Sequence, residues 1–193
     1  MVRYMGDTIL SISVIGGNIN LRDISKFSKR YKTEFIDNFC LDNPPKGLII
    51  SEKLNPRTKL YLKSALKNKI PILAYQKGFT ALIENSMNKT YENNNKQSDY
   101  LFLSPGAKIS HIIGGSGWIK TNFLPVRELK LNNLPENFFG SIMSKTGNII
   151  AYERSGSVWI FGISWDIFDS INLPKGFNKI FTVFIDKCYD KSL

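Results

Sequence analysis

The chain has few of the residues that build metal sites and disulfide frameworks. Cys40 and Cys188 are its only cysteines, and His111 is the only histidine among 193 residues. Two cysteines are too few for a disulfide scaffold or a cysteine-ligated metal, and one histidine cannot form a histidine cluster. We therefore expect no metal and no other cofactor, although a site made only of carboxylates stays open.

Long apolar runs are also lacking. The longest candidate, Val158–Trp165, contains Gly162 and Ser164. It is far shorter than the roughly 20 residues that a membrane-spanning helix needs. Near the N-terminus, Asp7 interrupts a stretch that otherwise resembles a weak signal sequence, and no small-residue cleavage site follows. These features predict a cytoplasmic protein with no membrane contact.

Positive charge is in excess, with 26 lysines and arginines against 16 acidic residues. The surplus is concentrated between Glu52 and Glu84, where the chain carries seven basic residues and no acidic one. Three of them, Lys59, Lys63 and Lys67, are spaced to lie along one helical face. They are candidates for binding anions such as nucleic acid. Few aromatic residues lie between them, so a solvated outer face is the alternative interpretation.

Hydrophobic periodicity predicts alternating strands and helices in the first half of the chain. The expected elements are a strand at 8–15, a helix around 21–31, a strand at 47–50, a helix at 56–69, a strand at 71–75 and a helix at 78–86. This order implies right-handed crossovers and an α/β fold: a three-layer, doubly wound, mainly parallel sheet. We treat 1–193 as a single domain, as this length allows.

Short strands predominate after a loop rich in asparagine. They are expected at 100–103, 108–113, 139–143, 148–152 and 158–163. The last element is a helix, because apolar residues from Phe177 to Cys188 recur at intervals of three and four. Cys188 is therefore assigned to the core, and so is Cys40 because of its apolar neighbours. His111 alternates with apolar residues and is expected to be a half-buried structural histidine of the 108–113 strand.

Polar residues follow three of the predicted strands, where the working groups of an open parallel sheet lie. The segments are Ser51-Glu-Lys53, Tyr75-Gln-Lys-Gly78 and Ser164-Trp-Asp-Ile-Phe168. Together with the order of elements from about Ile9 to Tyr189, they resemble the class I glutamine amidotransferases, the glutaminase domains of enzymes such as GMP synthase and anthranilate synthase. The resemblance implies that family's fold, with its nucleophile elbow at the turn before Gly78.

The family's catalytic residues are not found at the matching positions. The resemblance places Gln76 where the family has its nucleophilic cysteine, Asp166 where it has histidine, and Phe168 where it has glutamate. Glu52 and Lys53 stand at the oxyanion glycines. A carboxamide is not a nucleophile, and amide hydrolysis also needs a base and an oxyanion site. These positions therefore indicate a pseudoenzyme. Gln76 and Asp166 are expected to face each other across the pocket, close enough to hydrogen-bond.

Three functions follow from this interpretation. The first is an inactive amidotransferase-like protein that binds or regulates a partner, either a synthase-like subunit or a second copy of itself. The second is a divergent active glutaminase that supplies ammonia to a synthase, with Cys40 or Cys188 and His111 as relocated catalytic groups. The third is a basic nucleic-acid-binding protein that uses the 57–69 helix. Ammonia release from glutamine separates the second from the first, and salt-dependent retention on nucleic acid identifies the third.

Overall fold

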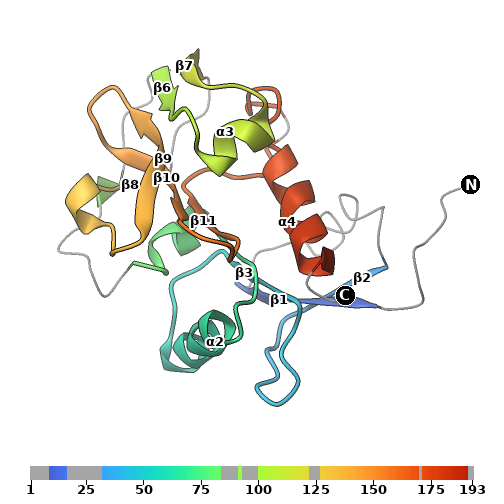
Figure 1. Ribbon diagram of the computed structural model, residues 1–193. Helices are drawn as coiled ribbons and strands as arrows, with labels where there is room; N and C mark the ends of the chain where they lie inside the picture. Colours follow the sequence, from blue (N-terminus) through green and yellow to red (C-terminus); the bar gives the residue numbers. More distant parts are fainter. Residues whose placement is uncertain are drawn as a thin grey trace, which may run out of the picture.

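The computed structural model describes residues 9–16, 32–83, 91–92, 100–121, 127–169 and 171–190. These residues form a large sheet with helices packed against it (Figure 1). In spatial order the nine strands are β2 (Thr33–Ile36), β1 (Leu10–Ile15), β3 (Gly47–Ile50), β4 (Ile72–Tyr75), β11 (Ile160–Ile163), β10 (Ile149–Arg154), β9 (Phe138–Ser144), β6 (Tyr100–Leu103) and β7 (Gly117–Lys120).

Strands β2, β1, β3, β4 and β11 are parallel neighbours, and they form the larger part of the sheet. Ile49 in β3 is aligned with Val14 in β1 and with Leu73 in β4. This confirms that the first three predicted strands are adjacent and parallel. Thr8, the first residue of the strand expected at 8–15, lies outside the described residues. The sequence did not indicate the edge strand β2, which is short and only half buried.

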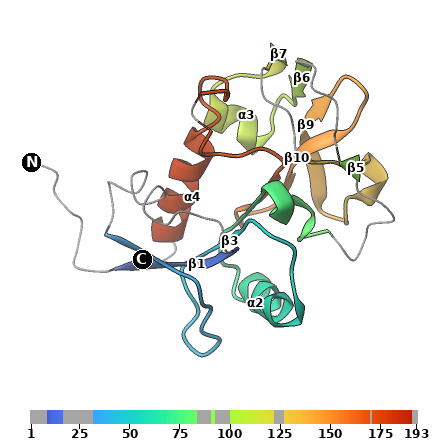
Figure 2. The ribbon, with the colours of Figure 1, turned by 180° about the vertical axis from the view of Figure 1, so that it is seen from behind.

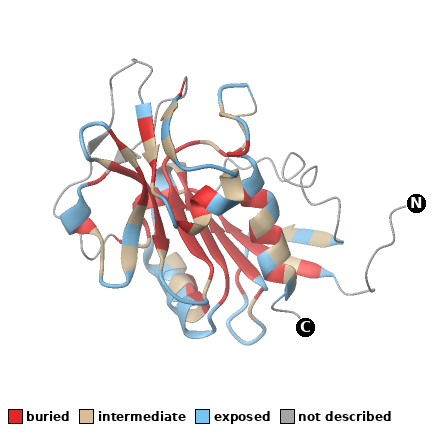
Figure 3. Ribbon diagram, turned by 45° about the horizontal axis from the view of Figure 1, so that its top comes forward, coloured by how far each residue is buried: buried red, intermediate tan, exposed pale blue. Residues whose placement is uncertain are grey.

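Helices α2 (Pro56–Lys67) and α4 (Lys179–Asp190) lie on opposite faces of the parallel strands (Figures 1 and 2). Side chains on a strand alternate between the two faces, so Ile50 packs in the cluster of α2, whereas Ile49 packs in that of α4. The central strands are therefore buried along their length (Figure 3). This arrangement confirms the predicted three-layer α/β fold.

The remaining four strands extend the sheet in antiparallel pairs from β11 to β7. They confirm the strands expected around 100–103, 139–143 and 148–152, with small shifts of their ends. A two-stranded sheet pairs β5 (Tyr91–Glu92) with β8 (Arg127–Glu128), and a short 3-10 helix, η3, spans Leu131–Asn133. Among the described residues, no helix is long and apolar enough to cross a membrane.

Helix α2 begins with a capping box. The Asn55 side chain accepts a hydrogen bond from the Thr58 N–H at 2.9 Å, and the Thr58 hydroxyl accepts one from the Asn55 N–H at 2.8 Å. The helix buries Tyr61 and Ala65 against the sheet. This i, i+4 pair sets the direction of the buried face, so the neighbouring Leu60 is 56% exposed.

The strand predicted at 108–113 is wrong, since these residues form helix α3 (Lys108–Ile113). The cause is a remote side chain. The carboxylate of Glu153, on β10, accepts hydrogen bonds from the N–H groups of Lys108 at 2.8 Å and Ile109 at 3.1 Å. It thereby satisfies donors that the first turn of a helix leaves unpaired. His111 is consequently exposed on α3 and is not a half-buried strand residue.

The two other predicted helices and the two cysteines differ in how well the structure agrees with the predictions. The predicted helix at 78–86 is instead the 3-10 helix η1 (Gln76–Thr80) followed by a turn to Ile83, and residues 84–86 lie outside the described residues. The helix expected around 21–31 lies outside them entirely. Cys188 is buried as predicted, but Cys40 is exposed, because the neighbouring Phe39 fills the core position.

The capping of α3 by Glu153 predicts a pH dependence of stability. Glu153 is fully buried, and loss of hydration raises the pKa of its carboxyl group above its ordinary value of 4.5, although the two backbone N–H groups oppose this rise. In the pH range above 4.5 the folded state therefore binds more protons than the unfolded state. The stability that protonated Glu153 contributes is lost as the pH rises through the folded-state pKa.

Glu153→Gln keeps the shape of the side chain and removes the titration. We expect the free energy of unfolding of the wild-type protein to decrease relative to that of Glu153→Gln as the pH rises from about 4.5 to neutrality. Urea denaturation at a series of pH values measures this difference. If the wild type instead became more stable than Glu153→Gln as the pH rose, the two hydrogen bonds would lower the pKa of Glu153 by more than the loss of hydration raises it.

Candidate functional site

Three adjacent parallel strands bring the candidate residues to one edge of the sheet. β3 pairs with β4 and β4 pairs with β11, so the segments that follow Ile50, Ala74 and Ile163 leave the sheet side by side. The structure thereby brings together Ser51, Tyr75 and Asp166 with their neighbours in sequence. This is the edge at which open α/β sheets carry their ligands.

Gln76, the first residue of η1, occupies the sharp turn that directly follows β4. Tyr75 is extended, with φ of −141°, and Gln76 has φ of 49°, in the left-handed region that few residues other than glycine adopt. A strand that passes through one strained residue directly into a helix is the geometry of a nucleophile elbow. The side chain of Gln76 is half buried at this turn.

The elbow packs directly on the end of β3 through Gly78. A Cβ atom at Gly78 would lie 2.1 Å from the carbonyl oxygen of Ile50, so no other residue fits there without moving the backbone. A second contact comes from β10, where the buried Tyr152 hydroxyl donates a hydrogen bond to the carbonyl oxygen of Phe79. The Tyr152 ring packs directly over Gly162 on β11, where any side chain would clash, because a Cβ atom at Gly162 would lie 2.1 Å from that ring.

Tyr75, at the end of β4, links the three strand ends. Its ring is buried, and its hydroxyl interacts with the side chain of Ser51 and with the charge of Asp166. Burial raises the pKa of the Tyr75 hydroxyl far above its ordinary value, and the Asp166 charge raises it further, while the Ser51 hydrogen bond opposes both. Tyr75 therefore remains a neutral phenol at physiological pH.

Phe168 belongs to an aromatic cluster. Its ring contacts that of Tyr75 at a centroid distance of 5.9 Å and that of Phe181, on α4, at 5.2 Å. The carboxylate of Asp166 accepts a hydrogen bond from the Phe168 N–H at 2.9 Å. The structure gives no hydrogen bond between Gln76 and Asp166, both of which are described, so the expected pairing of these two side chains is not found.

The residues expected at the oxyanion position lie beside the end of β1. Glu52 is half buried and Lys53 is exposed. Gly16, at the end of β1, approaches this segment so closely that a Cβ there would lie 1.9 Å from the Ser51 Oγ. Ser51 donates to the carbonyl oxygen of Ile15 at 3.3 Å. The polar groups at this edge are thus hydroxyl, carboxamide, carboxylate and ammonium groups, the last on the exposed Lys53 and Lys77.

The cysteines and the histidine are not brought to this edge. Cys188 is buried on α4 against Gly47, the first residue of β3, and therefore lies at the opposite end of that strand. Cys40 and His111 are both exposed. Lys59, Lys63 and Lys67 are exposed on the outer face of α2, as their spacing predicted. No group of three or more acidic, cysteine or histidine residues that could hold a metal ion occurs within the described ranges.

Sequence reasoning named Ser51 and Tyr75 as strand-end residues but gave them no role. Their interaction depends on the alignment of β3 with β4, which no local pattern reports. Ser164, which directly follows β11, is fully buried, whereas Lys77 in η1 is exposed.

Known proteins resemble this chain in structure but not in sequence. No protein-family model and no curated protein matches the sequence. Among solved structures, a Thermoplasma acidophilum protein provisionally described as a GMP synthase subunit matches with a TM-score of 0.68 and 15% identity, over 97% of this chain and 98% of that chain. The glutaminase domain of Trypanosoma brucei CTP synthase, with bound acivicin, matches with a TM-score of 0.69 and 11% identity, over 94% of each chain. The chain therefore has the class I glutamine amidotransferase fold.

Proposed function

We propose that this protein is a catalytically inactive glutamine amidotransferase-like protein that binds or regulates a partner. The observation that carries the proposal is Gln76, which occupies the strained turn of an otherwise complete elbow. The turn keeps its left-handed backbone and its glycine contact with β3. It presents a carboxamide, however, which cannot attack an amide carbon.

The groups around the elbow support the same conclusion. Phe168 stands at the position of the residue that would orient a catalytic base, and it packs between aromatic rings instead. Asp166 stands at the position of the base, but Gln76 offers it no proton to remove. Glu52 brings a carboxylate to the side where developing negative charge would need hydrogen-bond donors. At the positions that the resemblance assigns, the described residues Gln76, Asp166, Phe168 and Glu52 thus supply no nucleophile, no oriented base and no oxyanion donor, and Lys53 is exposed.

The partner role is supported by the neighbours in structure. One is described as a subunit of GMP synthase and the other is a domain of CTP synthase. Each of these proteins is thus named as part of a larger synthase. By analogy, this chain would associate with a synthase-like subunit or with a second copy of itself. The analogy rests on fold and so gives the class of partner only.

The first experiment tests for catalysis. We expect the purified wild-type protein to release no ammonia from glutamine and to resist covalent labelling by acivicin, because it has no activated nucleophile at the elbow. Gln76→Cys restores a thiol but not the base, the orienting acid or the oxyanion glycines. It should therefore gain little or no glutaminase activity.

The matched controls for this experiment are Cys40→Ser and Cys188→Ser. Ammonia release by the wild-type protein that either substitution abolished would reject the proposal. It would favour a divergent active glutaminase with a relocated cysteine.

A second experiment tests for the partner. The protein, purified under mild conditions from its own source, should elute in size-exclusion chromatography as a stoichiometric complex with a synthase-like subunit or as a defined oligomer. The complex should re-form from the separately purified components. If the protein eluted as a monomer both after purification from its source and after mixing with the candidate subunit, the partner role would be wrong. That result would not bear on the prediction that the protein has no glutaminase activity.

The exposed lysines of α2 support nucleic-acid binding as a second candidate function. Lys59, Lys63 and Lys67 form a stripe on the outer face of the helix. If they contact phosphates, replacing all three by alanine should reduce the slope of log affinity against log salt on duplex DNA by about 0.9 per lost contact. Sequence preference should not change. Filter binding at several salt concentrations measures the slope, and an unchanged slope would exclude this surface.

A further inference from the structure

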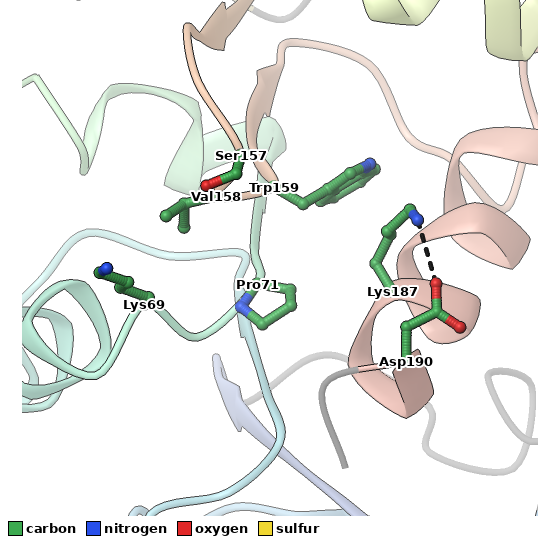
Figure 4. A pocket seen from close by; sticks show the side chains of 7 residues that line it. All are labelled: Lys69, Pro71, Ser157, Val158, Trp159, Lys187 and Asp190. Atoms are coloured by element: carbon green, nitrogen blue, oxygen red, sulfur yellow. Dashed lines mark hydrogen bonds and ion pairs between the residues drawn. The ribbon is translucent and has the colours of Figure 1, made fainter. Parts of the chain in front are cut away.

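A cavity lies at the opposite end of the parallel strands from Gln76. It has a volume of about 310 Å³ and is located where β4 and β11 begin (Figure 4). Pro71 immediately precedes β4 and Trp159 immediately precedes β11, whereas Gln76 and Asp166 follow the carboxyl ends of the same two strands. The cavity is therefore separate from the amidotransferase-like site. Its lining residues are Lys69, Pro71, Ser157, Val158, Trp159, Lys187 and Asp190.

The floor of this cavity is apolar and rigid. Pro71 and Trp159 are held by backbone hydrogen bonds, from the Leu48 N–H to the Pro71 carbonyl oxygen at 3.0 Å and from the Ile72 N–H to the Trp159 carbonyl oxygen at 2.8 Å. The Trp159 ring packs against Phe161 and Phe184, with centroid distances of 4.2 and 5.5 Å. Such a fixed apolar surface needs no rearrangement to receive a ligand.

Two lysines stand on opposite sides of this floor. Figure 4 shows Lys69 on one side of Pro71 and Lys187, from the last turn of α4, on the other. Asp190 is the acidic lining residue and pairs with Lys187 at 3.0 Å. Both members of that pair are about half exposed, so the pair is weak and an anionic ligand can compete with it.

Lys69 adopts a backbone conformation that favours glycine. Its φ is 55°, and hydrogen bonds from the Lys69 N–H to the Leu66 carbonyl oxygen and from the Ile70 N–H to the Ala65 carbonyl oxygen fix it there, at 3.2 and 2.9 Å. This is the usual end of a helix, where glycine avoids the steric cost. A lysine at this position costs stability, and its side chain lines the cavity.

We propose that this cavity binds a small organic anion that has a flat apolar part. The apolar part lies against Pro71, Val158 and Trp159, and the anionic group, a phosphate or a carboxylate, is bound by Lys69 and Lys187 together with the Ser157 hydroxyl. Among the described lining residues two lysines stand against one acid, so the cavity favours anions over cations. The proposal uses no residue of the Gln76 site and does not depend on the function proposed above.

Phenyl phosphate is a suitable probe, because it joins a flat ring to a phosphate group. Isothermal calorimetry of the full-length protein at physiological salt should show saturable binding of one equivalent. Lys69→Gly and Lys187→Ala should each weaken it about tenfold, as expected for the loss of a charge-assisted hydrogen bond. Asp190→Asn should strengthen it by a few fold, because Lys187 loses its competing partner.

Lys179→Ala is the matched control, since Lys179 is exposed at the other end of the same helix and its loss changes the net charge equally. It should bind phenyl phosphate as the wild type does. Lys69→Gly should keep or slightly raise the free energy of unfolding, so weaker binding by this variant cannot result from misfolding. Inorganic phosphate, which has no ring, should bind more weakly than phenyl phosphate.

Absence of saturable binding up to about 10 mM phenyl phosphate would overturn the proposal. So would equal affinities of Lys69→Gly, Lys187→Ala and Lys179→Ala, since binding would then follow net charge alone. If Lys187→Ala did not fold, the other two variants would still test the proposal. Lys69→Gly should weaken the binding of phenyl phosphate and Asp190→Asn should strengthen it, and any other result would refute the proposed site.

Discussion

The elbow at the end of β4 depends on the contact between Gly78 and the carbonyl group of Ile50. Because Gly78 has no side chain, the segment after Gln76 can turn back onto the end of β3. Gln76 then takes a left-handed conformation, and Tyr152 fixes the following turn through the Phe79 carbonyl. The shape of a nucleophile elbow thus results from backbone packing and does not require a nucleophile.

The side chains around the elbow have structural interactions of their own. Tyr75 and Phe168 extend the hydrophobic core toward the strand ends and connect to Phe181 on α4. An ionisable residue at position 168 would lie partly buried against these rings, which is costly without a partner. Position 168 can therefore carry either a ring of the aromatic cluster or a carboxyl group, but not both. In this chain Phe168 contributes to packing.

Most of the parallel part of the fold, β2 excepted, could be predicted from the sequence, because its signals are local. The runs that became β3 and β4 are short, apolar and bounded by turn residues, and α4 has an unbroken helical stripe. The segment 108–113 could not be predicted in this way. Its three isoleucines fit a strand or a helix, and the choice was made by Glu153, which lies more than 40 residues later in the sequence and caps α3. Cys40 was misplaced for a similar reason, since only packing decided that Phe39 is the buried neighbour.

The sequence by itself determined the residue types at each strand end, and with them which chemistry Gln76, Asp166 and Phe168 can support, because the reactivity of a side chain is set by its functional group. The tertiary structure decided which of these groups meet. The alignment of β3, β4 and β11 brings Ser51, Tyr75 and Asp166 together, and the common start of β4 and β11 creates the cavity between Lys69 and Lys187. Contacts between residues so far apart in sequence arise from strand pairing and helix packing, which local spacing does not encode.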